Sequence, residues 1–220
     1  MKVAIIGANG NVGGRLGEIL ADRGDEPTGF IRKEEQSGAL ESLGMKTQIA
    51  DIVSTEADDY ASMLEGMDAL VFTAGAGGAG VELTQAIDGK GVEKLIKAAE
   101  SAGVNRFLLV SAFPDAWRDK GMPDSFEFYM KMKRQADVSL ANSSLNWTIL
   151  RPGTLTDEKG EGNVTLGPAI PYGDTSRDHV AQVLAELLNN EETGQLVLEL
   201  TDGNTPVKTA VEQQNRPLRK

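Results

Sequence analysis

"KVAIIGANGNVGGRL", residues 2–16, joins a short apolar run to a glycine-rich turn near the start of the chain. After the turn, Val12, Leu16 and Leu20 recur at the spacing that places apolar side chains on one face of a helix. The stretch therefore predicts a buried strand, a tight turn and an amphipathic helix in direct succession. Units of this kind, repeated along a chain, build α/β folds.

Three glycines of this turn, Gly7, Gly10 and Gly13, have the spacing G-x-x-G-x-x-G. Glycines at such a corner permit a tight turn, a close approach of the backbone to a pyrophosphate, and close packing of the helix on the strand. Backbone amides at the start of the helix then face the anion. The alternative is a tight turn that binds nothing. We expect a dinucleotide site here, with contacts from Gly7, Asn9, Gly10, Asn11, Val12 and Gly13.

Apolar runs alternate with helical patterns along the rest of the chain, which is typical of a parallel sheet with crossover helices. Runs such as "LLV" at 108–110 are continuously apolar, as in strands that are covered on both faces. The expected strands are Val3–Ile6, Thr28–Ile31, Thr47–Ala50, Ala69–Thr73, Phe107–Ser111, Trp147–Leu150 and Leu196–Leu200.

The chain shows no linker and no repeat, so we expect one domain over residues 1–220. Two long stretches without a clear period, 112–125 and 153–175, are expected to be irregular loops with a functional role. Helices are expected to stop where a glycine would supply a left-handed cap. These positions are Gly24, Gly44, Gly103 and Gly194.

The 220 residues carry a formal net charge of −11, no cysteine and one histidine, His179. The absence of cysteine excludes disulfides and thiolate metal sites, and we expect no metal. The acidic balance disfavours nucleic acid as a partner, and we interpret the basic end "RPLRK", residues 216–220, as a solvated tail. No apolar run reaches the roughly 18 to 20 residues that span a bilayer, and the start lacks a secretory signal. We expect a cytoplasmic protein with no membrane partner.

Four longer segments carry a resemblance to a known family. They are "GFIRKEEQ" (29–36), "VFTAGAGGAG" (71–80), "IDGKGVEKLIKAAESAGVNRFLLVSA" (87–112) and "YMKMKRQADVSLANSSLNWTILRPG" (129–153). Together with the glycine turn, they resemble atypical short-chain dehydrogenase/reductases of the NAD(P)H-binding, NmrA-like kind over nearly the whole chain. The resemblance implies a single Rossmann-like α/β domain with a doubly wound parallel sheet. With the strands numbered along the chain, the expected order is 3-2-1-4-5-6-7.

The end of the second expected strand bears on the choice of cofactor. NAD-selective sites usually place an Asp or Glu there, which accepts a hydrogen bond from the ribose 2′-hydroxyl. Here Arg32 and Lys33 stand at that corner, and a guanidinium suits a 2′-phosphate. Glu34 and Glu35 follow; they fit the first turn of the next helix, although a shifted register would bring them into the acidic position. We therefore expect NADP(H) in preference to NAD(H).

The resemblance implies further cofactor contacts. Asp51 would accept from the adenine amino group, with Ile52 packed on the ring; alternatively, Asp51 would only close a turn at the strand end. Small residues after the fourth strand, and the turn after the sixth, would let the backbone approach the nicotinamide half. These contacts are Ala74, Gly75, Pro152 and Gly153. Arg15 would either reach a phosphate or remain a surface residue of its helix.

A catalytic set is also implied by the resemblance. Tyr129 and Lys133 have the family's Tyr-x-x-x-Lys spacing, and residues four apart lie on the same face of a helix. Tyr129 would donate a proton to a carbonyl oxygen, Lys133 would bind the nicotinamide ribose, and Ser111 would orient the same oxygen. The alternative is that Tyr129 is a wall residue and Lys133 only a cofactor contact.

The stretch 112–125 and the helix start behind it concentrate large side chains, namely Phe113, Trp117, Met122, Phe126 and Phe128. They would suit a flat apolar substrate, or they would form a small satellite core. The expected function is an NADPH-dependent reductase of a small quinone, flavin or carbonyl compound, acting as a monomer or homodimer. The alternatives are an NADP(H)-binding redox sensor or regulator that acts through a protein partner without turnover, and a sugar-nucleotide epimerase-like enzyme.

Other polar residues are expected to be structural. Ser176 would cap a helix, and His179 would be a packed or solvated residue at the start of that helix, without a catalytic role. Asp88 and Lys90 would begin a helix without a functional role, and Arg151 would pair with an internal carboxylate.

Overall fold

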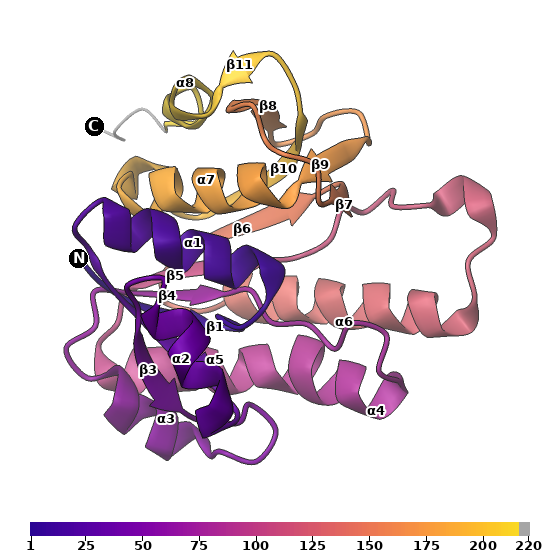
Figure 1. Cartoon of the computed structure of the whole chain (residues 1–220). Helices are drawn as coiled ribbons and strands as arrows, with labels where there is room; N and C mark the ends of the chain where they lie inside the picture. Colours follow the sequence, from indigo (N-terminus) through magenta and orange to yellow (C-terminus); the bar gives the residue numbers. More distant parts are fainter. Residues whose placement is uncertain (216–220) are drawn as a thin grey trace.

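The computed structural model describes residues 1–215, apart from the side chain of Asp119. The predicted basic tail at 216–220 lies outside the described residues. The described chain is a single α/β domain built on a nine-stranded sheet with the order β11-β8-β10-β6-β5-β4-β1-β2-β3 (Figure 1). The strands are β1 (Lys2–Ile6), β2 (Glu26–Ile31), β3 (Lys46–Ile49), β4 (Ala69–Phe72), β5 (Arg106–Val110), β6 (Asn146–Pro152), β8 (Asn163–Gly167), β10 (Leu196–Asp202) and β11 (Thr205–Pro206).

The strands from β3 to β10 are parallel and confirm the predicted order 3-2-1-4-5-6-7, because the seventh predicted strand is β10. Beyond β10 the sheet continues with β8, which is antiparallel to β10, and β11, which is antiparallel to β8. The parallel strands place their carboxyl ends along one edge of the sheet. Ligands of open α/β sheets bind at that edge.

The prediction of an irregular loop over 153–175 is wrong in part. This stretch contains β8, and it also contains β7 (Thr154–Thr156), which pairs with β9 (Asp174–Ser176) in a separate two-stranded sheet. In β8 only Val164 and Leu166 are buried apolar residues, with exposed Thr165 between them. An alternation this short, between glycines, cannot be told from a loop until the edge of β10 is present to pair with it.

Helices cover both faces of the sheet (Figure 1). One core combines alternate residues of β1, such as Val3 and Ile5, with apolar residues of α1 and α7, whereas Ala4 and Ile6 join the other core, with α3, α5 and α6. The helices are α1 (Asn11–Asp22), α2 (Ser37–Glu41), α3 (Ala57–Leu64), α4 (Val81–Thr84), α5 (Val92–Ala102), α6 (Asp124–Ala141), α7 (Arg177–Leu188) and α8 (Val207–Glu212). Shorter helical segments are the 3₁₀ turns Glu34–Gln36, Arg118–Lys120 and Glu191–Thr193 and a π-helical segment, Gln85–Gly91.

Three of the four predicted glycine stops are left-handed, with φ of 87° at Gly24, 80° at Gly44 and 74° at Gly103. The prediction for Gly194 is wrong, since its φ is −66° and Gln195 is the left-handed residue, with φ of 56°. Gly194 is required for another reason, because a Cβ there would overlap the Asn146 side chain.

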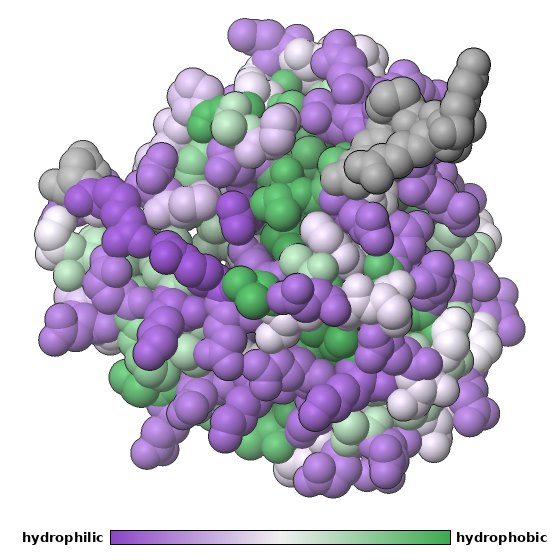
Figure 2. Space-filling model, turned by 180° about the vertical axis from the view of Figure 1, so that it is seen from behind, coloured by the Kyte–Doolittle hydropathy of each residue, from purple (hydrophilic) through white to green (hydrophobic). Residues whose placement is uncertain are grey.

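Figure 2 shows the face opposite to the view of Figure 1; it is mostly hydrophilic, with apolar side chains in patches that polar ones separate. Within residues 1–215, none of the helices is both long and apolar enough to cross a membrane.

Candidate active site

The glycine turn locks three elements together at the carboxyl edge of the sheet. Gly7 has a φ of +87°, and a Cβ on it would lie 2.6 Å from the backbone nitrogen of Ala74, at the end of β4. The Gly10 amide donates to the Gly7 carbonyl oxygen at 2.9 Å, and a Cβ on Gly13 would overlap that same carbonyl. The turn therefore leaves no room for side chains at Gly7 and Gly13. Gly10 caps α1 without a side chain, so the first amides of the helix stay open to a ligand.

Three cavities follow the carboxyl edge from β2 to the 112–125 segment. We call the first, beside Arg32 at the end of β2, the β2-side cavity; its volume is about 420 Å³. The next, beside Lys133, is the central cavity, with about 530 Å³. The last, beside Trp117, is the aromatic cavity, with about 290 Å³. The first two share lining residues from the glycine turn and the end of β4, including Gly10 and Ala74. The last two share Ser111 and Tyr129. The three cavities therefore adjoin one another along this edge, and we call them together the trough.

Most of the predicted site residues line this trough. The β2-side cavity is lined by Gly7, Asn9, Gly10, Arg32, Ile52, Ala74 and Gly75. The central cavity is lined by Gly10, Asn11, Val12, Ala74, Gly75, Ser111, Tyr129 and Lys133. The aromatic cavity is lined by Ser111, Tyr129, Pro152 and Gly153. The trough and its glycine cradle therefore fit a dinucleotide that runs from Arg32 to Tyr129.

Other predicted contacts do not line any of the three cavities. Gly13 packs α1 against the turn instead, and the Lys33 side chain is exposed. The Asp51 carboxylate accepts a hydrogen bond from the Val53 amide at 2.7 Å, which is the turn-closing alternative for this residue. The Arg15 guanidinium pairs with Asp178 at 2.6 Å, and Arg15 lines none of the three cavities.

The polar centre of the site lies on one face of α6, where Tyr129, Lys133 and Asp137 follow one another at intervals of four residues. The Lys133 ammonium is buried; it lies 3.1 Å from Asp88 Oδ1, donates to the Val110 carbonyl at 3.1 Å, and is 5.7 Å from the Tyr129 ring centre. Burial alone would lower the pKa of Lys133, but Tyr129 and Asp88 outweigh it, and the pKa is raised. Lys133 is therefore a fixed cation.

Asp88 is the residue whose role the sequence interpretation missed. It is 0% exposed, and its Oδ2 accepts from the Ala76 amide at 3.0 Å while Oδ1 faces Lys133. The prediction that Asp88 begins a helix is wrong, because Asp88 lies inside the π-helical segment Gln85–Gly91, which directly follows α4. Its contacts join Lys133 to the turn after β4. A signal was present: Asp88 lies on the same helical face as Val92 and Leu95, and a carboxylate on a buried face requires a partner.

Behind the site, Arg151 pairs with Asp137 at 2.8 Å, so the predicted pairing of Arg151 with an internal carboxylate is confirmed. Burial raises the pKa of Asp137, although Arg151 and the nearby Ser111 hydroxyl both favour its ionised form. Ser111 Oγ is buried at the end of β5 near Asp137, and it has no hydrogen bond of good geometry to the described residues. A hydroxyl that lines two cavities and is not held by a well-formed hydrogen bond is available to a ligand.

The predicted aromatic segment closes the far end of the trough. Trp117 and Phe126 are stacked with ring centres 5.5 Å apart, and Phe113 meets Tyr172 edge-on at 5.3 Å. All four line the aromatic cavity, whereas Met122 and Phe128 do not. Tyr172 belongs to the stretch 153–175, so the two predicted loops meet here.

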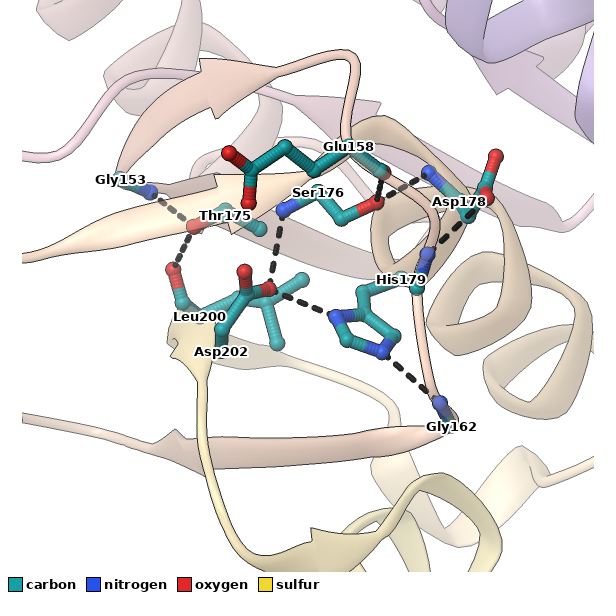
Figure 3. Close-up of polar contacts among 10 residues, drawn as sticks. Gly153, Glu158, Gly162, Thr175, Ser176, Asp178, His179, Leu200 and Asp202 are labelled. Atoms are coloured by element: carbon teal, nitrogen blue, oxygen red, sulfur yellow. Dashed lines mark hydrogen bonds and ion pairs between the residues drawn. The ribbon is translucent and has the colours of Figure 1, made fainter.

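The start of α7 is anchored by a polar cluster shown in Figure 3. Ser176 Oγ accepts from the Asp178 amide at 3.2 Å and donates to the Glu158 carbonyl at 2.7 Å, which confirms Ser176 as the helix cap. His179 is buried; its Nδ1 lies 2.6 Å from Asp202 Oδ1, and its Nε2 accepts from the Gly162 amide at 2.9 Å (Figure 3). Of the two expected states, packed or solvated, the structure shows His179 packed, and residues 158–162 are held against α7.

Comparison with known proteins gives a consistent result. Residues 7–191 match the family model described as NAD(P)H-binding. YhfK of Bacillus subtilis, named an uncharacterised sugar epimerase, is 37% identical over 215 residues, which cover 97% of this chain and 100% of YhfK. A solved Bacillus halodurans protein, named as an NAD-dependent epimerase/dehydratase, has a TM-score of 0.89 and 35% identity over 97% of this chain and 99% of its own. The oxidoreductase YlbE of Lactococcus lactis has a TM-score of 0.84 and 28% identity, with 97% of this chain and 96% of YlbE covered.

Proposed function

The chain belongs to the NAD(P)H-binding family, and from this premise we propose that it is an NADPH-dependent reductase of a small carbonyl compound, quinone or flavin. One observation carries the proposal: Ser111 and Tyr129 line both the central cavity and the aromatic cavity. A hydroxyl and a phenol thus stand between the central cavity, where the dinucleotide would end, and the aromatic cavity. That position is where a proton donor for a bound acceptor is needed.

The cofactor would be held mostly by backbone. The Gly7–Val12 turn would receive the pyrophosphate, and Ala74 and Gly75 would let the rest of the dinucleotide pass close to β4. Bound NADPH would supply the hydride for the reduction. Lys133, fixed by Asp88, would orient the ribose on the nicotinamide side.

The preference for NADP(H) rests on charge at the β2 end of the trough. Arg32 lines the β2-side cavity, and among its described lining residues there is no Asp or Glu. Glu34 and Glu35 lie in the 3₁₀ turn after Lys33, away from the cavity lining. A 2′-phosphate would therefore meet a guanidinium and no carboxylate.

Tyr129 and Ser111 would act on the acceptor. Tyr129 would donate the phenol proton to the acceptor oxygen, and the Lys133 ammonium, 5.7 Å from the ring centre, would stabilise the negative charge left on the phenol. The Ser111 hydroxyl, which lines both cavities, would donate a hydrogen bond to the same oxygen and so orient it.

The size and lining of the aromatic cavity favour a compact ring compound. At about 290 Å³ it lies at the lower limit of small-molecule sites, and aromatic rings form much of its wall. Two of the relatives named above carry epimerase names, and an epimerase would have to hold a nucleotide sugar beside the dinucleotide. The small pocket favours the reductase over that alternative.

The test is to follow NADPH absorbance with quinones, flavins and aldehydes as acceptors, using wild type, Tyr129→Phe and Tyr60→Phe. Tyr60 is a matched control, because it lines none of the three cavities and its hydroxyl has only a 3.4 Å contact with the Ala50 carbonyl. We expect consumption with at least one acceptor class and a loss of about a hundredfold or more in Tyr129→Phe alone, the range for a general acid.

Other results would contradict the proposal. Protein loaded with NADPH that reduces no acceptor would favour the redox-sensing alternative. Interconversion of UDP-glucose and UDP-galactose without net NADPH consumption would favour the epimerase alternative.

A further inference from the structure

The trough has a charge that differs from that of the molecule. The chain carries a net charge of −11, yet the charged residues among the described lining of the three cavities are Arg32, Lys133 and Arg177, all cations. Arg32 stands at the β2 end, and Lys133 is already paired with Asp88. Arg177 is the cation whose place in the trough the proposed reduction does not explain.

Arg177 stands where the acceptor would bind. It lines both the central and the aromatic cavity, together with Tyr129 and Ser111. In the aromatic cavity it is the only charged residue among the described lining residues. A planar guanidinium beside aromatic rings is suited to a flat ligand that carries a carboxylate.

The partner of Arg177 can be exchanged for a ligand. Arg177 Nη1 lies 3.1 Å from Asp157 Oδ2, but the Asp157 side chain is 66% exposed, whereas that of Arg177 is 23% exposed. An ion pair with one partner largely in water contributes little to stability. Asp157 also lies 3.8 Å from Arg15, so it would keep a neighbouring cation if Arg177 turned to a substrate.

The backbone of Arg177 is fixed although its side chain can exchange partners. Arg177 is the first residue of α7, directly after the Ser176 cap, and the His179 bridge between Asp202 and Gly162 holds the next part of the helix (Figure 3). The guanidinium therefore reaches the trough from an anchored position. Anchoring of this kind is what a specificity residue requires.

We propose that Arg177 binds a carboxylate of the substrate, so that the acceptor is an aromatic or other flat ring compound bearing an anionic group. This inference rests on the proposed reductase function and specifies its substrate class. The ring would lie among Phe113, Trp117 and Tyr172, with the carboxylate on Arg177 and the reducible group toward Tyr129.

The experiment compares two probes of the same ring, 4-carboxybenzaldehyde and 4-methylbenzaldehyde. Binding of each to protein loaded with NADP⁺ is measured by calorimetry, and turnover of each by NADPH absorbance. The proteins are wild type, Arg177→Met and the matched control Arg134→Met, since Arg134 is exposed on α6 and lines none of the three cavities. NADPH affinity is measured for all three.

We expect wild type and Arg134→Met to bind the carboxylated probe at least roughly tenfold more tightly than the methylated one, as for a charge-assisted hydrogen bond. In Arg177→Met the ratio of the two affinities should fall to about one. The inference is overturned if wild type has no such preference or binds neither probe, or if the preference survives in Arg177→Met. A loss of NADPH affinity in Arg177→Met as large as the loss for the carboxylated probe would also overturn it, by assigning Arg177 to the cofactor.

The two proposals fail in distinguishable ways. An Arg177-dependent preference in binding, without turnover of either probe, would support the anion site and count against aldehyde reduction. Turnover of both probes at similar kcat/KM, with no preference in binding, would support the reductase and overturn the role of Arg177.

Discussion

The two ends of the trough are held by different kinds of interaction. At the glycine end, a Cβ on Gly7 would lie 2.6 Å from the Ala74 nitrogen, and Lys133 is paired with fully buried Asp88. At the aromatic end, the walls include side chains of the stretches 112–125 and 153–175 and of the start of α6, and Arg177 pairs with Asp157, which is largely exposed. Backbone contacts and a buried pair allow one arrangement only, whereas side chains and an exposed pair can rearrange around different ligands.

The largest effect is expected from the buried pair. Asp88→Asn would leave the Lys133 ammonium buried without a countercharge, and we expect a loss of about 3 to 5 kcal/mol in the free energy of unfolding. Urea unfolding measures it. A loss below about 1 kcal/mol would mean that the glycine end is no more rigidly held than the aromatic end.

The glycine turn itself should control cofactor binding. In Gly10→Val the added side chain would occupy the wall shared by the β2-side and central cavities, so we expect NADPH affinity to fall by about a hundredfold or more. Calorimetric titration with NADPH measures this loss, with Gly38→Val as the control, because a Cβ on Gly38 meets nothing within 4 Å. Unchanged affinity in Gly10→Val would remove the turn from the cofactor site.

The choice between nucleotides should depend on one side chain. Arg32→Ala should weaken NADPH binding by about tenfold while leaving NADH binding within about twofold, since only NADPH carries the 2′-phosphate. Binding of both nucleotides to both proteins tests this expectation. Equal losses for the two nucleotides would show that Arg32 does not contact the 2′-phosphate.

A pH dependence of stability is expected from Asp137, which follows Lys133 by one turn of α6. Burial raises its pKa above the ordinary value of 3.8, so the folded protein holds this proton more tightly than the unfolded chain does. The contribution of Asp137 to stability is then fully present below about pH 3.8 and falls as the pH rises through its raised pKa in the folded protein. The free energy of unfolding of wild type minus that of Asp137→Asn, measured by urea unfolding at a series of pH values, should therefore fall as the pH rises from about 3.8 through the raised pKa. A rise in this difference with pH would contradict the raised pKa of Asp137.

The smallest effect is expected from the exposed pair. Asp157→Asn should change the free energy of unfolding by at most about 0.5 kcal/mol, because the Asp157 side chain is 66% exposed. The same urea experiment as for Asp88→Asn gives the comparison directly. A loss comparable with that of Asp88→Asn would show that Arg177 is locked, and the contrast between the ends would disappear.

The same contrast explains what could be predicted from sequence. The glycine end can be recognised in the sequence, because local geometry alone requires Gly7, Gly10 and Gly13. The parallel strands can be predicted from their continuous apolar runs. The pairing of Asp88 with Lys133 joins residues 45 positions apart, and only packing of the π-helical segment against α6 brings them together. Local periodicity contains no information about such a contact.

The aromatic end was less predictable for the same reason. Trp117 and Phe126 were visible as an aromatic segment, but Tyr172 and Arg177 enter the wall only because β7 pairs with β9. That pairing joins two strands of three residues each, which is too short for a readable pattern. A side chain such as Arg177, which directly follows β9, becomes a candidate only when that strand is placed.

The central claim is that one trough holds NADP(H) at its glycine end and presents Ser111 and Tyr129 to an acceptor at the other. A crystal structure with NADP⁺ bound tests it most directly. We predict the 2′-phosphate against Arg32, the pyrophosphate against residues 9–12, and the nicotinamide in the central cavity beside Tyr129, with the aromatic cavity open next to it. A nicotinamide that lies outside the central cavity, or that fills the aromatic cavity and leaves no place for an acceptor, would contradict the account.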